Sequence, residues 1–561
     1  MKAGVIRSAL VLLCCLLPAG LMVAGLPLTA PPPEAGPTTP PPAQADADGS
    51  IAAPSGREVP PEVRAEQEMR RRHEEEIQKA RDELAGRPSD PAPLEKLVDV
   101  LMVEHRGREA REAAEKFVAA NPSLPRGFAC LGRALYWLGE FDLALLQFQR
   151  ASSIDPKDAT CLIWLGRTHA SLGNNEGAME VLQRALTLDG DDIRALSAIA
   201  ALEEEAKNYA AASKTWERVA LLIEAKKPSQ GVMQFVRHRL LQDLAKKGMS
   251  VEGLPPAGLT VPLRTFQKVP ALKVLLNGRA ERYLMIDLSA QETVLTAEAS
   301  HDLELPEYGG PSYREADGPG TGVEAMAILD TIKVGPLLIH RAPVSVNPWL
   351  KYPTPEIAGI IGRRLLSEFL LTIDYPGKVI TLAPRPAKPV EGEPLFTNRA
   401  LLVEARYKGR SAGKWVVDTS TYTPAPVSIL WAQDTLGLRI GSPGVRPLLH
   451  KSYIYSFTMP EIEIAGVTWA KYRATGVDFR SLSEQIQMEV MGVLSNSLLA
   501  DTKATFDLAH RRMRLERTQA QGYRSPGKQP QPEPQQGNPQ EKPRPAQGDE
   551  GAGPGTGSGG R

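Results

Sequence analysis

The chain contains 561 residues, of which 66 are lysine or arginine and 66 are aspartate or glutamate, so its formal net charge is zero. A chain of this length predicts two to four domains. The balanced charge argues against nucleic acid or an anionic membrane surface as the main partner.

Residues 1–30 have the pattern of an export signal. Lys2 and Arg7 precede a nearly unbroken apolar run over residues 9–25, and small residues follow it. This arrangement is typical of a secretory signal peptide, and the run is also long enough for a retained membrane anchor. Residues 31–60, which are rich in proline, predict a solvated linker. We therefore expect export to the periplasm or another part of the cell envelope, with cleavage or anchoring left open.

Residues 61–250 carry a repeat with a period of 34 residues. Gly132 and Gly166 are separated by this interval, as are Ala144 and Ala178. Turn-forming pairs follow the same spacing, namely Asn121-Pro122, Asp155-Pro156 and Asp189-Gly190. The pattern resembles the tetratricopeptide repeat, in which helix pairs stack into an all-α solenoid. The resemblance implies a groove that holds a protein partner or an extended peptide, and a role as a rigid spacer is the alternative.

One short segment in the remaining half occurs twice. Residues 283–290 and 414–421 each consist of an apolar run that ends on an aspartate, Asp287 or Asp418, followed by small or hydroxyl side chains. An apolar run bounded by a polar turn predicts a buried strand. A carboxylate at the end of a buried strand is costly unless it is hydrogen-bonded or used. Both aspartates are therefore candidate functional residues.

The similarity between the two segments extends further along the chain. Residues 359–366 align with residues 492–499 without a gap. Because self-similarity is a strong architectural signal, we interpret residues 262–386 and 395–517 as two copies of one small all-β unit.

The order of motifs in each copy indicates a family. A strand that ends in aspartate, a glycine-rich segment, two hydrophobic residues before a glycine, and a closing strand succeed one another in the first copy. This order resembles the retropepsin-like aspartic peptidases. The resemblance implies a tandem pseudo-dimer of acid-protease barrels, with Asp287 and Asp418 as the catalytic pair. Gly318, Gly320 and Gly322 would form the flap over a peptide or protein substrate.

The chemistry of that family requires two carboxyl groups. Carboxylates held about 3 Å apart do not both ionise readily, so one keeps a proton while the other accepts a proton from water. In this chain, each copy would supply one aspartate, and the two carboxyl groups would titrate as a pair.

The residues that follow each aspartate depart from the family pattern. Thr419 keeps a hydroxyl that bonds across the dimer axis in the family, whereas Leu288 lacks it. Ser289 and Ser420 stand where the family has glycine, and a Cβ there is a steric burden. Thr419 and the two serines are the expected support of the aspartate loops. The departures leave open an exported aspartic endopeptidase, an inactive peptide-binding scaffold, or two copies that do not face each other.

The other residue types point to no further chemistry. The eight histidines are scattered without metal-ligand spacing, so we expect no metal and no cofactor. Asp374 and Asp507 are predicted to form structural turns. Cys130 and Cys161 are expected to be packing residues, with a disulfide between them left open. Residues 518–561, which are rich in proline, glutamine and glycine, are expected to be disordered.

Overall fold

The computed structural model describes residues 61–227, 230–309, 325–438, 446–447 and 455–517. The predicted export signal, the proline-rich linker, the three flap glycines and the carboxy-terminal tail lie outside the described residues. Among the residues within these ranges, no helix combines the length and the hydropathy needed to cross a membrane.

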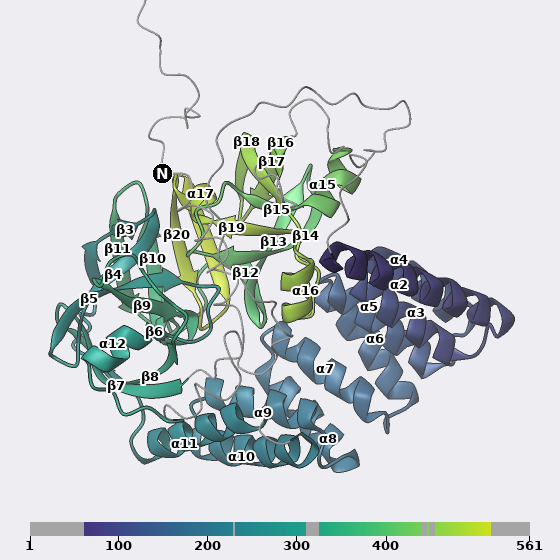
Figure 1. Ribbon diagram of the computed structural model, residues 1–561, viewed down its shortest axis with the longest axis horizontal. Coiled ribbons are helices and arrows are strands. Elements are labelled where there is room, and N and C mark those ends of the chain that lie inside the picture. The colour runs from purple at the N-terminus through teal and green to yellow at the C-terminus, as the bar shows by residue number, and fades with distance from the viewer. Residues whose placement is uncertain (1–60, 228–229, 310–324, 439–445, 448–454, 518–561) are drawn as a thin grey trace, which may run out of the picture. The chain divides into compact units, whose positions relative to one another are not determined.

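The first half of the described chain is a solenoid of ten helices (Figure 1). These are α2 (Pro61–Gly86), α3 (Pro91–Val103), α4 (Gly107–Ala120), α5 (Pro125–Trp137), α6 (Phe141–Ile154), α7 (Ala159–Ser171), α8 (Asn175–Leu188), α9 (Ile193–Glu205), α10 (Tyr209–Lys226) and α11 (Val232–Lys246). The all-α solenoid predicted for this part of the chain is confirmed.

Glycines at the helix crossings explain part of the 34-residue spacing. A Cβ on Gly132 of α5 would lie 2.7 Å from the Phe148 ring of α6. A Cβ on Gly166 of α7 would lie 2.6 Å from Leu182 of α8. The absence of a side chain therefore lets the two helices of each pair approach closely, and the apolar ring or methyl groups of the second helix fill the space.

Polar residues begin several of these helices. The side chains of Asp158, Asn174, Asp192 and Asn208 accept hydrogen bonds from backbone N–H groups in the first turns of α7, α8, α9 and α10. Such caps satisfy donors that have no partner inside the helix. These four capping residues therefore mark helix starts, whereas Asn121, Asp155 and Asp189 of the turn-forming pairs follow the ends of α4, α6 and α8.

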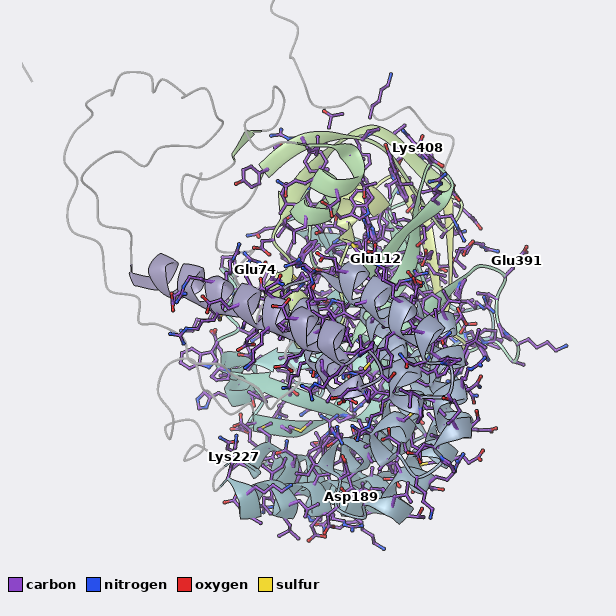
Figure 2. All side chains as sticks on the ribbon, turned by 90° about the vertical axis from the view of Figure 1, so that its right-hand side faces the viewer. Glu74, Glu112, Asp189, Lys227, Glu391 and Lys408 are labelled. Atoms are coloured by element: carbon purple, nitrogen blue, oxygen red, sulfur yellow. The ribbon has the colours of Figure 1, made fainter. Side chains whose placement is uncertain are left out.

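Charged side chains cover the exposed faces of the helices, as Figure 2 shows for Glu74 on α2 and Glu112 on α4. In contrast, Cys130 and Cys161 are buried in α5 and α7, and both are free thiols. Their predicted packing role agrees with this placement, and no disulfide joins them.

The second half of the described chain contains two closed barrels of six strands each (Figure 1). The first is formed, in order of pairing, by β4 (Val269–Leu276), β5 (Ala280–Asp287), β9 (Ile357–Gly362), β6 (Val294–Thr296), β8 (Leu337–Asn347) and β7 (Ala325–Val334). The second is formed in the same order by β13 (Ala400–Tyr407), β14 (Arg410–Asp418), β19 (Gly492–Ser495), β15 (Pro426–Ser428), β18 (Val467–Val477) and β17 (Tyr455–Ile464). Equal pairing orders give the two barrels the same topology.

A further antiparallel sheet combines strands of both copies. Its strands, in order, are β12 (Glu393–Asn398), β21 (Arg512–Arg517), β20 (Thr502–Asp507), β10 (Phe369–Asp374), β11 (Val379–Pro384) and β2 (Leu259–Pro262). This sheet continues into the second barrel, because β12 pairs with β13. Most of β2 precedes residue 262, where the sequence predicted the first copy to begin. The strand belongs to this shared sheet because it pairs with β11.

The register of the shared sheet relates the two copies by an approximate two-fold axis. Thr372 of β10 lies opposite Thr505 of β20, and their hydroxyl oxygens are 3.1 Å apart. These threonines occupy equivalent positions in the two copies, and the neighbouring pairs are symmetric about them. The two copies therefore face each other across this sheet, which answers one of the alternatives that the sequence left open.

Short elements complete the β-rich half. These are β1 (Ser250–Glu252), β3 (Arg264–Phe266), α12 (Ala297–Asp302), α14 (Arg363–Leu366), α15 (Ile429–Leu436), β16 (Arg446–Pro447), α16 (Arg480–Ile486) and α17 (Asn496–Leu499).

The solenoid packs against the second copy through side chains and backbone. The rings of Phe141 in α6 and Phe396 in β12 are 5.8 Å apart. The Glu489 N–H donates to the carbonyl of Trp137 at 2.7 Å. Residues of both halves belong to one apolar core. Part of the solenoid surface is therefore covered by the same chain, and only the rest is open to a protein partner.

Candidate aspartate-pair site

The two candidate aspartates occupy equivalent positions in the two barrels. Asp287 is the last residue of β5 and lies opposite Gly362 of the parallel strand β9. Asp418 is the last residue of β14 and lies opposite Ser495 of the parallel strand β19. Only 1% of Asp287 and 6% of Asp418 is exposed. Both carboxyl groups are therefore largely removed from water.

Each carboxyl group is held by its own loop in the same way. Oδ1 of Asp287 accepts hydrogen bonds from the N–H and the hydroxyl of Ser289, at 2.9 and 2.6 Å, and from the N–H of Ala290. Oδ1 of Asp418 accepts from the N–H and the hydroxyl of Ser420, both at 2.7 Å, and from the N–H of Thr421. Such donors stabilise the charged form of a buried carboxylate.

The two serines support their loops, as the sequence analysis expects, but the steric burden expected of their Cβ atoms is not seen. Ser289 and Ser420 do not adopt the left-handed backbone that would require glycine. Their hydroxyl groups instead supply a hydrogen bond to the adjacent carboxylate that glycine could not supply. Neither position therefore needs the glycine conformation on which the expected steric burden depends.

Thr419 links the two aspartate loops across the approximate two-fold axis. Its hydroxyl accepts a hydrogen bond from the N–H of Leu288 at 3.0 Å and donates one to the carbonyl of Ile286 at 2.8 Å. Leu288 is fully buried in the apolar core and cannot return the equivalent bonds. This connection between the loops is therefore made from the second copy alone.

The two carboxyl groups also interact electrostatically. Burial raises the pKa of Asp287 above its usual value, and the hydroxyl groups of Ser289 and Ser420 oppose this rise. Burial and then the negative charge of Asp287 raise the pKa of Asp418 to about 6. Because like charges in a dry site do not ionise together readily, the pair retains a proton at mildly acidic pH.

Arg363 supports the first loop, although sequence reasoning assigned it no role. It is the first residue of α14, and its guanidinium donates to the carbonyls of Ser289 and Arg399 at 2.8 and 3.1 Å. Burial lowers the pKa of Arg363 to about 10, while the charges of Glu292 and Asp287 oppose this change. Its position directly after two hydrophobic residues and a glycine was the signal that could have identified it.

Asn496 occupies the equivalent position in the second copy. Its side-chain amide donates to the carbonyl of Thr419, and its carbonyl oxygen accepts from the hydroxyl of Tyr375 at 2.5 Å. Burial raises the pKa of Tyr375, and the charge of Asp418 adds to this rise. The second loop is thus supported by neutral groups, whereas an arginine supports the first.

The aspartates of the two closing strands have structural roles, as the sequence predicts. Asp374 accepts a hydrogen bond from the N–H of Gly377 at 2.7 Å, which closes the turn after β10. Asp507 accepts from the N–H of Val390, and its Oδ2 lies 2.9 Å from Nδ1 of His510. Neither contact reaches the candidate pair.

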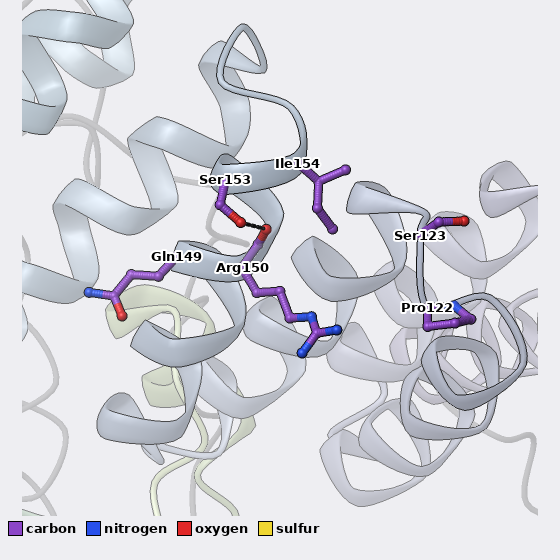
Figure 3. Close-up of a pocket in the computed structure, with 6 residues that line it drawn as sticks. All are labelled: Pro122, Ser123, Gln149, Arg150, Ser153 and Ile154. Atoms are coloured by element: carbon purple, nitrogen blue, oxygen red, sulfur yellow. Dashed lines mark hydrogen bonds between the residues drawn. The ribbon is translucent and has the colours of Figure 1, made fainter.

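Other parts of the described chain offer no comparable chemistry. A concave region of about 610 Å³ lies on the solenoid, and it is lined by Pro122, Ser123, Gln149, Arg150, Ser153 and Ile154 (Figure 3). The only charged side chain in this lining is that of Arg150, which stacks over the ring of Phe128 at 4.8 Å. Within the described ranges, no group of three or more His, Cys, Asp or Glu side chains is arranged to hold a metal ion.

Comparisons with known proteins identify the helical half. Residues 135–202 match the family model of the tetratricopeptide repeat. Among solved structures, the chain is similar to MamA, with 24% identity over 27% of this chain and 88% of that one, at a TM-score of 0.24. It is also similar to a thermophilic TPR protein from Thermus thermophilus, with 21% identity over 33% of this chain and 97% of that one, at a TM-score of 0.27. No curated protein matches the chain.

The family match shows a tetratricopeptide-type protein-interaction domain in the helical half. The matched residues begin in α5 and end in α9, so they cover part of the helical region, residues 61–250, that the 34-residue spacing predicts. The match does not extend to the β-rich half.

Proposed function

We propose that the protein is an exported aspartic-type endopeptidase of the retropepsin-like kind, with a tetratricopeptide domain that docks a protein. One observation carries the proposal: Asp287 and Asp418 lie buried at equivalent strand ends, in loops that Thr419 links and with charges that interact. Two carboxyl groups in that relation can share one proton. The duplicated barrels and their shared sheet are consistent with this assignment.

The proposed reaction divides the acid and base roles between the two carboxyl groups. The ionised carboxylate takes a proton from a water molecule, whose oxygen attacks the carbonyl carbon of a peptide bond. The protonated carboxyl group gives its proton to the carbonyl oxygen. The three donors on each Oδ1 hold the carboxyl groups in place during these transfers.

The raised pKa values set the expected pH range. Cleavage requires one proton on the pair, and this proton is lost as the pH rises through the folded pKa of Asp418, which is about 6. Activity is therefore expected at mildly acidic pH and should fall above pH 6.

The first test is peptide-bond cleavage by the purified full chain. Wild type and Asp418→Asn are incubated with an unfolded protein between pH 4 and pH 7.5, and new amino termini are counted. Asn keeps the shape of the side chain but cannot ionise, so the rate should fall by at least ~100-fold. Asp374→Asn is the matched control, since that aspartate closes a turn away from the pair. Equal cleavage by wild type and Asp418→Asn contradicts the proposal.

A second candidate function is a peptide-binding envelope scaffold that does not cleave. The observation that favours it is Leu288, which cannot make the hydrogen bonds that Thr419 makes. The triple variant Leu288→Thr, Ser289→Gly and Ser420→Gly restores the family residues and separates the two candidates. If this variant cleaves and wild type does not, the natural chain is a pseudo-peptidase.

Export is part of the proposal and rests on residues 1–30. Their basic start and apolar run are what an export signal requires. Expression of the full chain, cell fractionation and amino-terminal sequencing test it. Recovery of the intact chain in the cytoplasm would contradict export, and a new amino terminus near residue 30 would distinguish cleavage from anchoring.

A further inference from the structure

Four charged side chains from the solenoid and the first barrel form one network. Glu204 of α9 is bound by Arg237 of α11 at 2.6 Å and by Arg364 of α14 at 2.6 Å. The same two arginines bind Glu292 at 2.7 and 2.8 Å. Only 2% of the Glu204 side chain is exposed. Burial alone would raise the pKa of Glu204, but the charges of Arg237 and Arg364 outweigh it and lower the pKa to about 2.

This network ends on the loop that carries Asp287. Glu292 follows Asp287 in the same loop, and its backbone passes directly over β9. A Cβ on Gly362 would lie 2.1 Å from the Glu292 carbonyl oxygen, so the loop rests on this glycine. The N–H of Arg364 also donates to the carbonyl of Gln291 at 3.0 Å. The loop is therefore fixed both by its backbone and by the Glu292 side chain.

The equivalent loop of the second barrel is fixed in another way. Ser495 stands at the position of Gly362, and its hydroxyl donates to the carbonyl of Thr423 at 3.0 Å. Thr423 stands where the first loop has Glu292, so this loop has no carboxylate there for an arginine to bind. The ionic connection to the solenoid is thus a feature of the first aspartate loop that the second does not share.

We propose that Glu204 is a positioning residue for the aspartate pair. Through Arg237 and Arg364 it holds Glu292, and with it the loop that sets the place of the Asp287 carboxyl group. The solenoid then has a function beyond docking, because its last repeat fixes one half of the candidate site. An effect of Glu204 on catalysis rests on the proposed function, whereas its restraint of the loop that carries Asp287 does not.

Hydrogen exchange of the full chain tests the restraint, because the two loops serve as internal references for each other. Amide exchange is measured by mass spectrometry in peptides that cover residues 283–296 and 414–427. Glu204→Gln should speed exchange in the first peptide by at least ~10-fold and leave the second unchanged. Glu203→Gln is the matched control, since the Glu203 carboxylate accepts a hydrogen bond from Thr215 within the solenoid.

A second variant covers the case in which Glu204→Gln fails to fold. Glu292→Gln leaves Glu204 bound to both arginines and should speed exchange in the first peptide by itself. Unchanged exchange there in the folded variants, or equal acceleration of both peptides, overturns the proposal. In the cleavage assay, Glu204→Gln should lower kcat and shift the pH profile while KM changes little. If wild type does not cleave, the exchange result still decides the positioning role.

Discussion

The hydroxyl of Thr419 joins the two aspartate loops by hydrogen bonds, so its removal is an informative perturbation. Thr419→Val keeps the shape of the side chain and deletes the bonds to the Leu288 N–H and the Ile286 carbonyl, at 3.0 and 2.8 Å. Each bond contributes about 1 kcal/mol, and an unsatisfied buried donor costs about 1–3 kcal/mol. We therefore expect the free energy of unfolding of the β-rich half to fall by about 2–4 kcal/mol.

The assay is urea-induced unfolding of the full chain, followed by hydrogen exchange in peptides from β5 and β14. Thr505→Val is the control, because its hydroxyl bonds to that of Thr372, which remains partly exposed to water. This control should lose less than about 1 kcal/mol. Equal losses in the two variants would refute the idea that Thr419 joins the loops energetically.

Three further outcomes are expected. The pKa of Asp418 is about 6 in the folded protein, above its ordinary value of 3.8. The protonated Asp418 side chain therefore contributes its full stabilisation of the folded state below pH 4, and this stabilisation is lost as the pH rises to 6. Urea titrations should show wild type losing about 3 kcal/mol over this range relative to Asp418→Asn. Gly362→Ala forces a Cβ against the Glu292 carbonyl oxygen and should cost about 1–3 kcal/mol in the same titration. Gly132→Ala should lower the thermal midpoint of the solenoid by circular dichroism, because its Cβ would lie 2.7 Å from the Phe148 ring. Gly190→Ala should not, because its Cβ would meet its nearest neighbours at ordinary van der Waals distances of 3.6 and 3.7 Å.

The duplication could be predicted from the sequence because it lies in local patterns. The apolar runs that end on Asp287 and Asp418 are the strands β5 and β14, and both aspartates end their strands. The glycine spacing of the solenoid likewise follows from contacts between neighbouring helices, such as that of Gly132 with Phe148. Patterns of this kind reflect interactions within a few tens of residues, and a single sequence displays them directly.

Thr419 and the two serines could be predicted as support of the aspartate loops, but the ionic support of the first loop could not, because it depends on contacts between distant segments. Glu204 and Arg364 are separated by 160 residues, and nothing near either one indicates the other. The prediction that the Cβ of Ser289 would be a steric burden on its loop failed for a related reason. The effect of a Cβ depends on the backbone conformation, and the sequence does not show that this serine avoids the left-handed region and donates to Asp287.

The two copies agree in backbone and differ in the side chains around the carboxyl groups. The N–H groups of Arg363 and Asn496 donate to the carbonyls of Ala290 and Thr421 in the same manner, so the loops share one backbone arrangement. Arg363 nevertheless places a positive charge beside the first loop, whereas Asn496 places a neutral amide beside the second. Because the charge of Arg363 interacts with that of Asp287, we expect these unequal neighbours to make the two carboxyl groups titrate differently.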